Sequence, residues 1–358
     1  MHAKTKYKNM EKRNQLLDVA KGVAIIFVVL GHAIQQCSGI DSRDVLDSWI
    51  ERYLISFYMP LFMLVSGYLF YFSLLRHSEK DIVNGRLKMF AWPILTIAVV
   101  HHLRGHITHF EVNTFLADFP MSLFNSLWFF WALLVITLLV CLVHRYGRDH
   151  WIGYVAIIGM TLLLPDAYPL RAYVHLLPTF IVAYMFAKYG VVKKIFRGCG
   201  FLLCTLMMTI LVSVHLLMLR YFDYDTMIYF SRYSLLGSQD ILGDLSRDTF
   251  RFVIGIVGSI AVLLALYLTI NSSLIRKKKI LESLKYVGSI TFGIYVFQDL
   301  MLLAMGPLSK HLNKDYYVLN SAVAFLVILT MSIVLTRLAG KNRWLSVLFL
   351  GKVIKRDS

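Results

Sequence analysis

The chain has 358 residues, of which 58% are hydrophobic and 16% are charged, and its formal net charge is +16. In soluble domains about a quarter of the residues are charged, so this composition excludes an ordinary soluble protein. The apolar residues are gathered in long runs, which predicts a polytopic membrane protein.

Ten apolar segments are long enough, or nearly so, to cross a bilayer as helices. We therefore expect an all-α integral membrane protein with about ten transmembrane helices, forming one domain over residues 1–358. Cytoplasmic basic tails are expected at about residues 1–15 and 341–358. The third and fifth segments are short. In chain order, the segments are 16–37, 53–75, 89–103, 126–144, 150–165, 172–190, 200–219, 250–270, 284–306 and 317–337.

Basic residues are distributed unevenly between the loops. Lysines and arginines gather in both tails and in the loops after the second, fourth, sixth and eighth segments, whereas the other loops hold most of the acids. The positive-inside rule then places both termini in the cytoplasm. The net charge is therefore interpreted as an orientation signal beside anionic lipid, and nucleic acid is not an expected partner.

The first segment, LLDVAKGVAIIFVVLGH, carries three ionisable residues: Asp18, Lys21 and His32. Such groups are costly in hydrocarbon unless they are paired or face a cavity, so they commonly mark functional sites. Lys21 and His32 are eleven residues apart, about 16 Å along a helix. They would lie on one helix face, with the lysine near the cytoplasmic surface and the imidazole well inside the membrane.

Unusual residues recur in three later segments. The second contains SFYMPLFMLVSGYLF, in which Pro60 and Gly67 predict a broken or tightly packed helix. The fourth opens with SLWFF, which includes Trp128. The ninth contains GSITFGIYVFQD, which includes Tyr295 and Asp299 one turn apart.

A histidine cluster lies where the third segment ends. On a helix, His102, His106 and His109 would share a face and, with Glu111, could coordinate zinc. The alternative, which we favour, is a polar cap at the membrane interface. No metal is therefore expected in this chain.

Taken together, these motifs resemble the integral-membrane acyltransferase-3 family, which includes bacterial O-acetyltransferases of cell-surface polysaccharides. The first segment is similar to the family's Asp-x-x-(Arg/Lys)-Gly…His signature, and the SFYMPLFMLVSGYLF stretch is similar to its F-x-M-P-x-F-x-x-x-S-G-Y helix. The SLWF opening and the late Gly-x-Ser…Tyr element also look similar. Lys21, with Gly31 before the histidine, is closest to the fucose 4-O-acetylase-like subgroup.

Two positions depart from the family pattern. Members often carry a histidine three residues after the late tyrosine, but this chain has Gln298, so no catalytic role is assigned there. The loop before the third span often holds a pair of arginines. Here Arg86 is present, Phe90 stands at the second position, and Lys88 could substitute.

The resemblance implies an enzyme, an O-acetyltransferase in the bacterial inner membrane. The donor would be acyl-CoA, most simply acetyl-CoA, and the acceptor a hydroxyl of a lipid-linked or exported envelope saccharide. His32 would act as a general base or carry the acyl group. Asp18 would orient or neutralise Lys21. Expected contacts are Lys21, Arg86 and Lys88 to the CoA phosphates, and Trp128, Tyr295 and Asp299 to the acceptor.

Other interpretations of the same residues stay open. Lys21 could be only an orientation charge, with Asp18 as its ion-pair partner, and Trp128 could belong to an interfacial aromatic belt. Asp299 could make a polar interhelical contact. For the whole chain, the rival functions are a transporter or flippase for a polysaccharide intermediate and a non-catalytic membrane component. Binding of acyl-CoA would distinguish the enzyme from a flippase.

Overall fold

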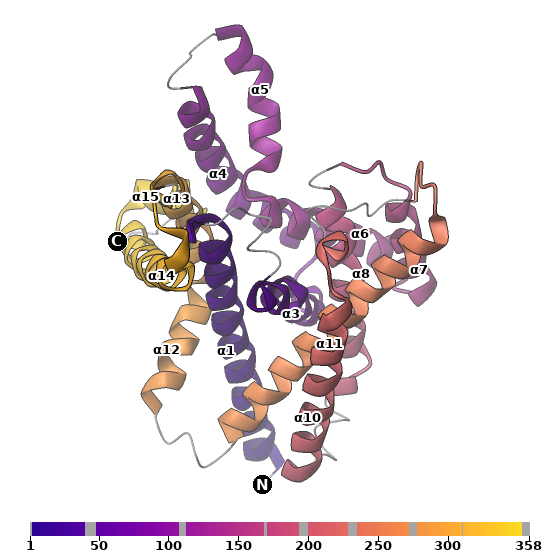
Figure 1. The fold of residues 1–358 in the computed structure, drawn as a ribbon. Helices are drawn as coiled ribbons and strands as arrows, with labels where there is room; N and C mark the ends of the chain where they lie inside the picture. Colours follow the sequence, from indigo (N-terminus) through magenta and orange to yellow (C-terminus); the bar gives the residue numbers. More distant parts are fainter. Residues whose placement is uncertain are drawn as a thin grey trace, which may run out of the picture.

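A computed structural model describes residues 2–39, 48–106, 112–167, 170–192, 200–227, 235–271, 278–309 and 311–352 (Figure 1). Within these ranges the chain is helical and contains no strand, which confirms the all-α prediction. In the part of the chain that the structure describes, nine helices are long and apolar enough to span a membrane: Gln15–Cys37 of α1 (His2–Cys37), α3 (Trp49–Leu74), α4 (Glu79–His106), α6 (Trp128–Tyr146), α8 (Leu170–Lys188), α10 (Phe201–Met218), α11 (Ile241–Asn271), α13 (Thr291–Ser309) and α14 (Tyr317–Lys341).

The remaining helices are shorter. The fifth predicted segment corresponds to α7 (Trp151–Leu162), which has 12 residues. The others are α5 (Val112–Asn125), α12 (Lys278–Ser289) and α15 (Arg343–Leu350). We call the end of the bundle near Leu74 and Lys188 the inner end, and the end near Cys37 and His106 the outer end, following the charge-based orientation.

The third segment is much longer than the sequence indicated. Its helix, α4, begins at Glu79 rather than near residue 89, because Ser78 caps the first turn and accepts a hydrogen bond from the backbone of Asp81. At the outer end α4 is followed by α5, which packs back against it, and the two helices project from the bundle (Figure 1). The sequence analysis did not predict α5.

The bundle is arranged around two central helices, α1 and α3. On one side α1 packs against α12, α13 and α14, and on the other side α3 packs against α8 and α11 (Figure 1). The chain therefore contributes its first two spans to the centre, and later spans enclose them from both sides.

Glycines bring the central helices into backbone contact with their neighbours. A Cβ atom at Gly22 would lie 2.3 Å from the Leu284 carbonyl oxygen, and one at Gly288 would lie 1.9 Å from the Asp18 carbonyl oxygen. These glycines hold α1 against the junction of α12 and α13. At α3, a Cβ atom on Gly67 would lie 2.2 Å from the Phe180 carbonyl oxygen in α8. Small residues allow this close approach between membrane helices.

The second span is packed tightly and is not broken. α3 continues through Pro60 from Trp49 to Leu74. A Cβ atom added at Gly255 in α11 would lie 2.7 Å from the Pro60 ring, so α11 covers the helix closely at this point. Of the two predicted outcomes, tight packing is correct and interruption is wrong.

The glycine contact at α1 gives a stability prediction. We expect Gly288→Ala to destabilise the fold by about 1–3 kcal/mol, because the added methyl group overlaps backbone that cannot move independently. Gly159→Ala on α7 is the matched control, since no atom lies within 4 Å of its added Cβ. Thermal unfolding of the purified variants in lipid measures the difference, and equal Tm values would contradict the close contact.

Candidate active site

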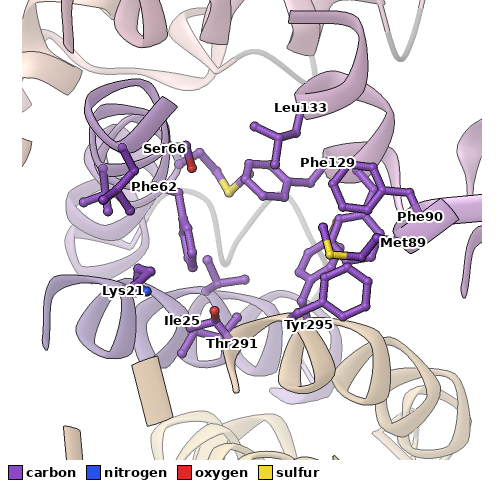
Figure 2. A pocket seen from close by; sticks show the side chains of 16 residues that line it. Lys21, Ile25, Phe62, Ser66, Met89, Phe90, Phe129, Leu133, Thr291 and Tyr295 are labelled. Carbon is purple, nitrogen blue, oxygen red and sulfur yellow. The ribbon is translucent and has the colours of Figure 1, made fainter. Parts of the chain in front are cut away.

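An apolar cavity of about 140 Å³ opens between α1, α3, α4, α6 and α13 (Figure 2). Among the described residues that line it, Lys21 supplies the one cationic side chain, and Ser66, Thr291 and Tyr295 carry hydroxyls. We call this space the inner cavity. It is lined by Lys21, Ile25, Val28, Met59, Phe62, Val65, Ser66, Leu69, Met89, Phe90, Phe129, Phe130, Leu133, Thr291, Phe292 and Tyr295.

One face of α1 leads along this cavity. Lys21, Ile25 and Val28 line it, and their spacing of four and three residues keeps them on one side of the helix. His32 is the next residue on the same face, one turn beyond Val28 towards the outer end. The lysine and the histidine therefore lie on one face of α1, which we call the α1 strip, and of the two only Lys21 lines the cavity.

At the inner end of this strip, Lys21 is paired with Asp18. The Lys21 Nζ lies 2.7 Å from the Asp18 Oδ1, and both side chains are partly exposed. The pair leaves the ammonium group among the lining residues of the inner cavity. Asp18 thus contacts Lys21 as the sequence indicated, and it does not itself line the cavity.

Three aromatic rings from three helices form one wall of the cavity. Phe130 of α6 stacks on Phe90 of α4 with ring centroids 4.9 Å apart, and on Phe292 of α13 at 4.6 Å. The planes are within 9° of parallel in both pairs. Tyr295 packs its ring 4.9 Å from that of Phe130. The wall is flat, apolar and buried at its centre, because Phe130 is only 3% exposed.

His32 lies beside α13, where its half-buried ring meets two consecutive polar residues. The Gln298 and Asp299 side chains lie near enough to the ring for their electrostatic effects to act on it. Within the described residues, His32 Nδ1 and Gln298 Oε1 are buried atoms that have no hydrogen-bond partner. Such atoms are costly to bury, so this junction has spare capacity for polar contacts.

A second, polar cavity of about 400 Å³ lies at the outer end, between α4, α5 and α13. Asp299 lines it, and the Asp299 Oδ2 lies 2.6 Å from His101 Nε2. We call this space the outer cavity. Its lining residues are His101, His106, Asp118, Met121, Ser122, Asn125, Ser126 and Asp299. His32, beside Gln298 and Asp299, thus lies where the strip from the inner cavity reaches the residues of the outer one.

The sequence matches the acyltransferase-3 family, described as an acyltransferase domain, over residues 14–339. This chain belongs to the acyltransferase-3 family. The resemblance inferred from the motifs is therefore confirmed over nearly the whole chain.

Two curated proteins that are similar in sequence to this chain are nodulation proteins. Nodulation protein NolL of Sinorhizobium fredii (strain NBRC 101917 / NGR234) is 30% identical over 191 residues, 49% of this chain and 49% of that protein. Nodulation protein NolL of Mesorhizobium japonicum (strain LMG 29417 / CECT 9101 / MAFF 303099) is 27% identical over 187 residues, 49% of this chain and 48% of that protein. The chain thus spans about half the length of these relatives. No solved structure matches it.

Of the other predicted site residues in this family member, some line a cavity and others do not. Tyr295 lines the inner cavity and Asp299 the outer one. Trp128 lines neither and is half-buried beside Phe129, with ring centroids 6.1 Å apart. The guanidinium of Arg86 lies 5.5 Å above the Phe70 ring. Lys88 is exposed, and neither cation lines the inner cavity.

Several site residues were missed by the sequence analysis. Phe130 belongs to the SLWFF motif and Phe292 to the GSITFGIYVFQD motif. The sequence did not indicate that their rings form a wall of the inner cavity. His101 was passed over because its neighbours His102 and His106 form the helical face that resembles a zinc site. Only the fold reveals that His101 points to α13 instead.

The neighbouring histidines connect α4 to α5. His102 Nδ1 lies 2.9 Å from the Ser122 hydroxyl, and its Nε2 lies 2.7 Å from the Phe115 carbonyl oxygen. The described residues contain no group of three or more metal-ligating side chains, and His109 and Glu111 lie outside those residues. His102 therefore joins the two helices that wall the outer cavity.

We expect His102→Ala to loosen α5 without unfolding the bundle. The change removes both hydrogen bonds of a side chain that is 2% exposed, which should lower the free energy of local opening by about 1–3 kcal/mol. Amide hydrogen exchange over residues 112–125 measures the effect. His77→Ala, at an exposed position of the inner end, is the control, and equal exchange in both variants would contradict the assignment.

Proposed function

We propose that this protein is a membrane O-acyltransferase that moves an acyl group, most simply acetyl, from cytoplasmic acyl-CoA to a hydroxyl of a cell-envelope saccharide. The observation that carries the proposal is the position of His32, which follows the inner-cavity face of α1 and lies beside the residue that lines the outer cavity. Family membership supports acyl transfer as the chemistry. The bacterial inner membrane is the proposed location.

The inner cavity suits the donor. A thioester and the arm that carries it are largely apolar, and the stacked wall of Phe90, Phe130 and Phe292 offers a flat apolar surface to them. Lys21 would meet the CoA phosphates, with Arg86 and Lys88 further out as a cationic approach.

The outer cavity suits the acceptor. Its histidines, carboxylates, amide and hydroxyls match the hydrogen-bonding groups of a sugar, and it opens at the end of the bundle that the charge distribution assigns to the outside. An acceptor hydroxyl reaching inward along α13 would meet Asp299 and then His32. The acceptor would be a lipid-linked or exported saccharide.

His32 would supply the chemistry in one of two ways. As a general base, it would take the proton of the acceptor hydroxyl, which raises the rate by about 10²–10⁴-fold. As a nucleophile, it would carry the acyl group from the donor to the acceptor. Both routes use the same position of the ring between the cavities.

The main experiment supplies purified protein in lipid with radiolabelled acetyl-CoA and an extract of lipid-linked envelope glycans. We expect His32→Gln to lower transfer of label to glycan by about 10²–10⁴-fold. His215→Gln is the matched control, since His215 is another buried intramembrane histidine, whose Nε2 lies 3.1 Å from the Ser56 hydroxyl and which lines neither cavity. Folded wild type that binds no acyl-CoA would contradict the enzyme and favour a flippase.

A second prediction concerns the donor cation. We expect Lys21→Gln to raise the KM for acetyl-CoA about ten-fold, equal to about 1.4 kcal/mol of lost binding, with a smaller effect on kcat. Lys285→Gln is the control, because Lys285 is also a paired lysine, 2.8 Å from Glu282, and lies outside the cavity. An unchanged KM would reduce Lys21 to an orientation charge.

A further inference from the structure

His101 and Asp299 form a paired histidine and carboxylate in the wall of the outer cavity. His101 Nε2 lies 2.6 Å from Asp299 Oδ2, although the residues are 198 positions apart and belong to α4 and α13. The side chains are 37% and 32% exposed, so the pair is accessible from the cavity that it lines. Arg104, one turn after His101, donates to the Leu303 carbonyl and joins the same two helices.

The pairing determines where the imidazole carries its proton. A carboxylate only accepts hydrogen bonds, so the neutral ring has its proton on Nε2 and a free lone pair on Nδ1. Within the described residues, His101 Nδ1 has no hydrogen-bond partner, whereas both ring nitrogens of His102 are occupied. His101 is therefore oriented by Asp299 and also has a nitrogen that is free to accept a proton. His106 in the same cluster is oriented differently, because its Nδ1 lies 3.0 Å from the His102 carbonyl oxygen.

The pair also adjoins the reacting centre. Asp299 follows Gln298, which interacts with the His32 ring, and the Asp299 charge acts on that ring. A hydroxyl in the outer cavity close to His32 would therefore lie beside the His101–Asp299 pair. The site then contains two imidazoles, His32 and His101, that are linked through Asp299.

We propose that His101, oriented by Asp299, is the base that deprotonates the acceptor hydroxyl, which leaves His32 free to carry the acyl group. The inference rests on the proposed function. His101 would be a catalytic residue and Asp299 a positioning residue, as a carboxylate that holds an imidazole in one tautomer.

A neutral His32 nitrogen attacks the thioester carbon, the C–N bond forms, the C–S bond breaks, and CoA leaves as a thiolate that takes a proton from solution at the inner end. The acceptor oxygen then attacks the acyl carbon while its proton moves to His101 Nδ1. The new C–O bond forms, the C–N bond breaks, and His32 regains its lone pair as neutral imidazole. His101 releases its proton to the outer cavity.

The test compares two acceptors in the presence of radiolabelled acetyl-CoA. The glycan extract offers hydroxyls that need a base, whereas hydroxylamine attacks acyl groups as a neutral nucleophile without prior loss of a proton. We expect His101→Gln and Asp299→Asn to lower transfer to glycan by about 10²-fold or more, while enzyme-dependent formation of acetohydroxamate, after subtraction of the direct reaction of hydroxylamine with acetyl-CoA, changes by less than about three-fold. The double variant should be no worse than His101→Gln alone, because the pair acts as a unit.

His144→Gln is the matched control. His144 Nδ1 lies 2.9 Å from Glu79 Oε1 in a pair of similar exposure, 33% and 28%, at the inner end. This variant should keep both activities. It removes a histidine–carboxylate contact between helices without touching either cavity.

The other outcomes separate a wrong assignment of the base from a wrong proposed function. If His101→Gln loses both activities, as expected for His32→Gln, or retains transfer to glycan, the assignment of the base is overturned. If the wild type forms acetohydroxamate but labels no glycan, the saccharide acceptor is wrong and the role of His101 falls with it. If the wild type labels neither acceptor, the proposed acyltransferase activity itself fails.

Discussion

The backbone contact between α1 and the α12–α13 junction is the constraint on which the site depends. Gly22 and Gly288 have no side chain, so the two segments meet at distances that a Cβ atom would prevent. This contact sets the rotation of α1 about its own axis. With Gly22 directed at α12, the strip of Lys21, Ile25, Val28 and His32 turns towards α3 and α13. A larger residue at either glycine would displace the strip from its cavity.

The two cavities differ in polarity. The apolar inner cavity suits the donor of a group transfer, and the polar outer cavity suits the acceptor. The inner cavity is almost wholly apolar, and an apolar environment strengthens the attraction between the few charges placed in it. The outer cavity is lined by groups that exchange hydrogen bonds with water or with sugar hydroxyls. His32 lies between them, close to atoms that the described residues leave without partners.

The sequence predicted the helical class, the first-helix strip and the close approach at Gly67, because each is a property of a single segment. It could not predict arrangements in which two segments meet. The packing of α4 places Arg86 and Lys88 outside the lining of the inner cavity, and their role at the CoA phosphates stays a prediction. The aromatic wall and the His101–Asp299 pair each combine residues from helices distant in sequence, and no spacing within one helix encodes which faces of two helices are opposed.

The unequal polarity of the two cavities also shapes the electric field in the protein. In the charge-based orientation, a polar hollow that opens at the outer end would carry the outside potential inward, and the membrane voltage would fall mainly across the apolar inner half. Displacing one charge through the full voltage changes its energy by about 2.3 kcal/mol per 100 mV. Charge that separates along α1 would then be coupled to the energised state of the membrane, whereas proton movement within the outer cavity would not.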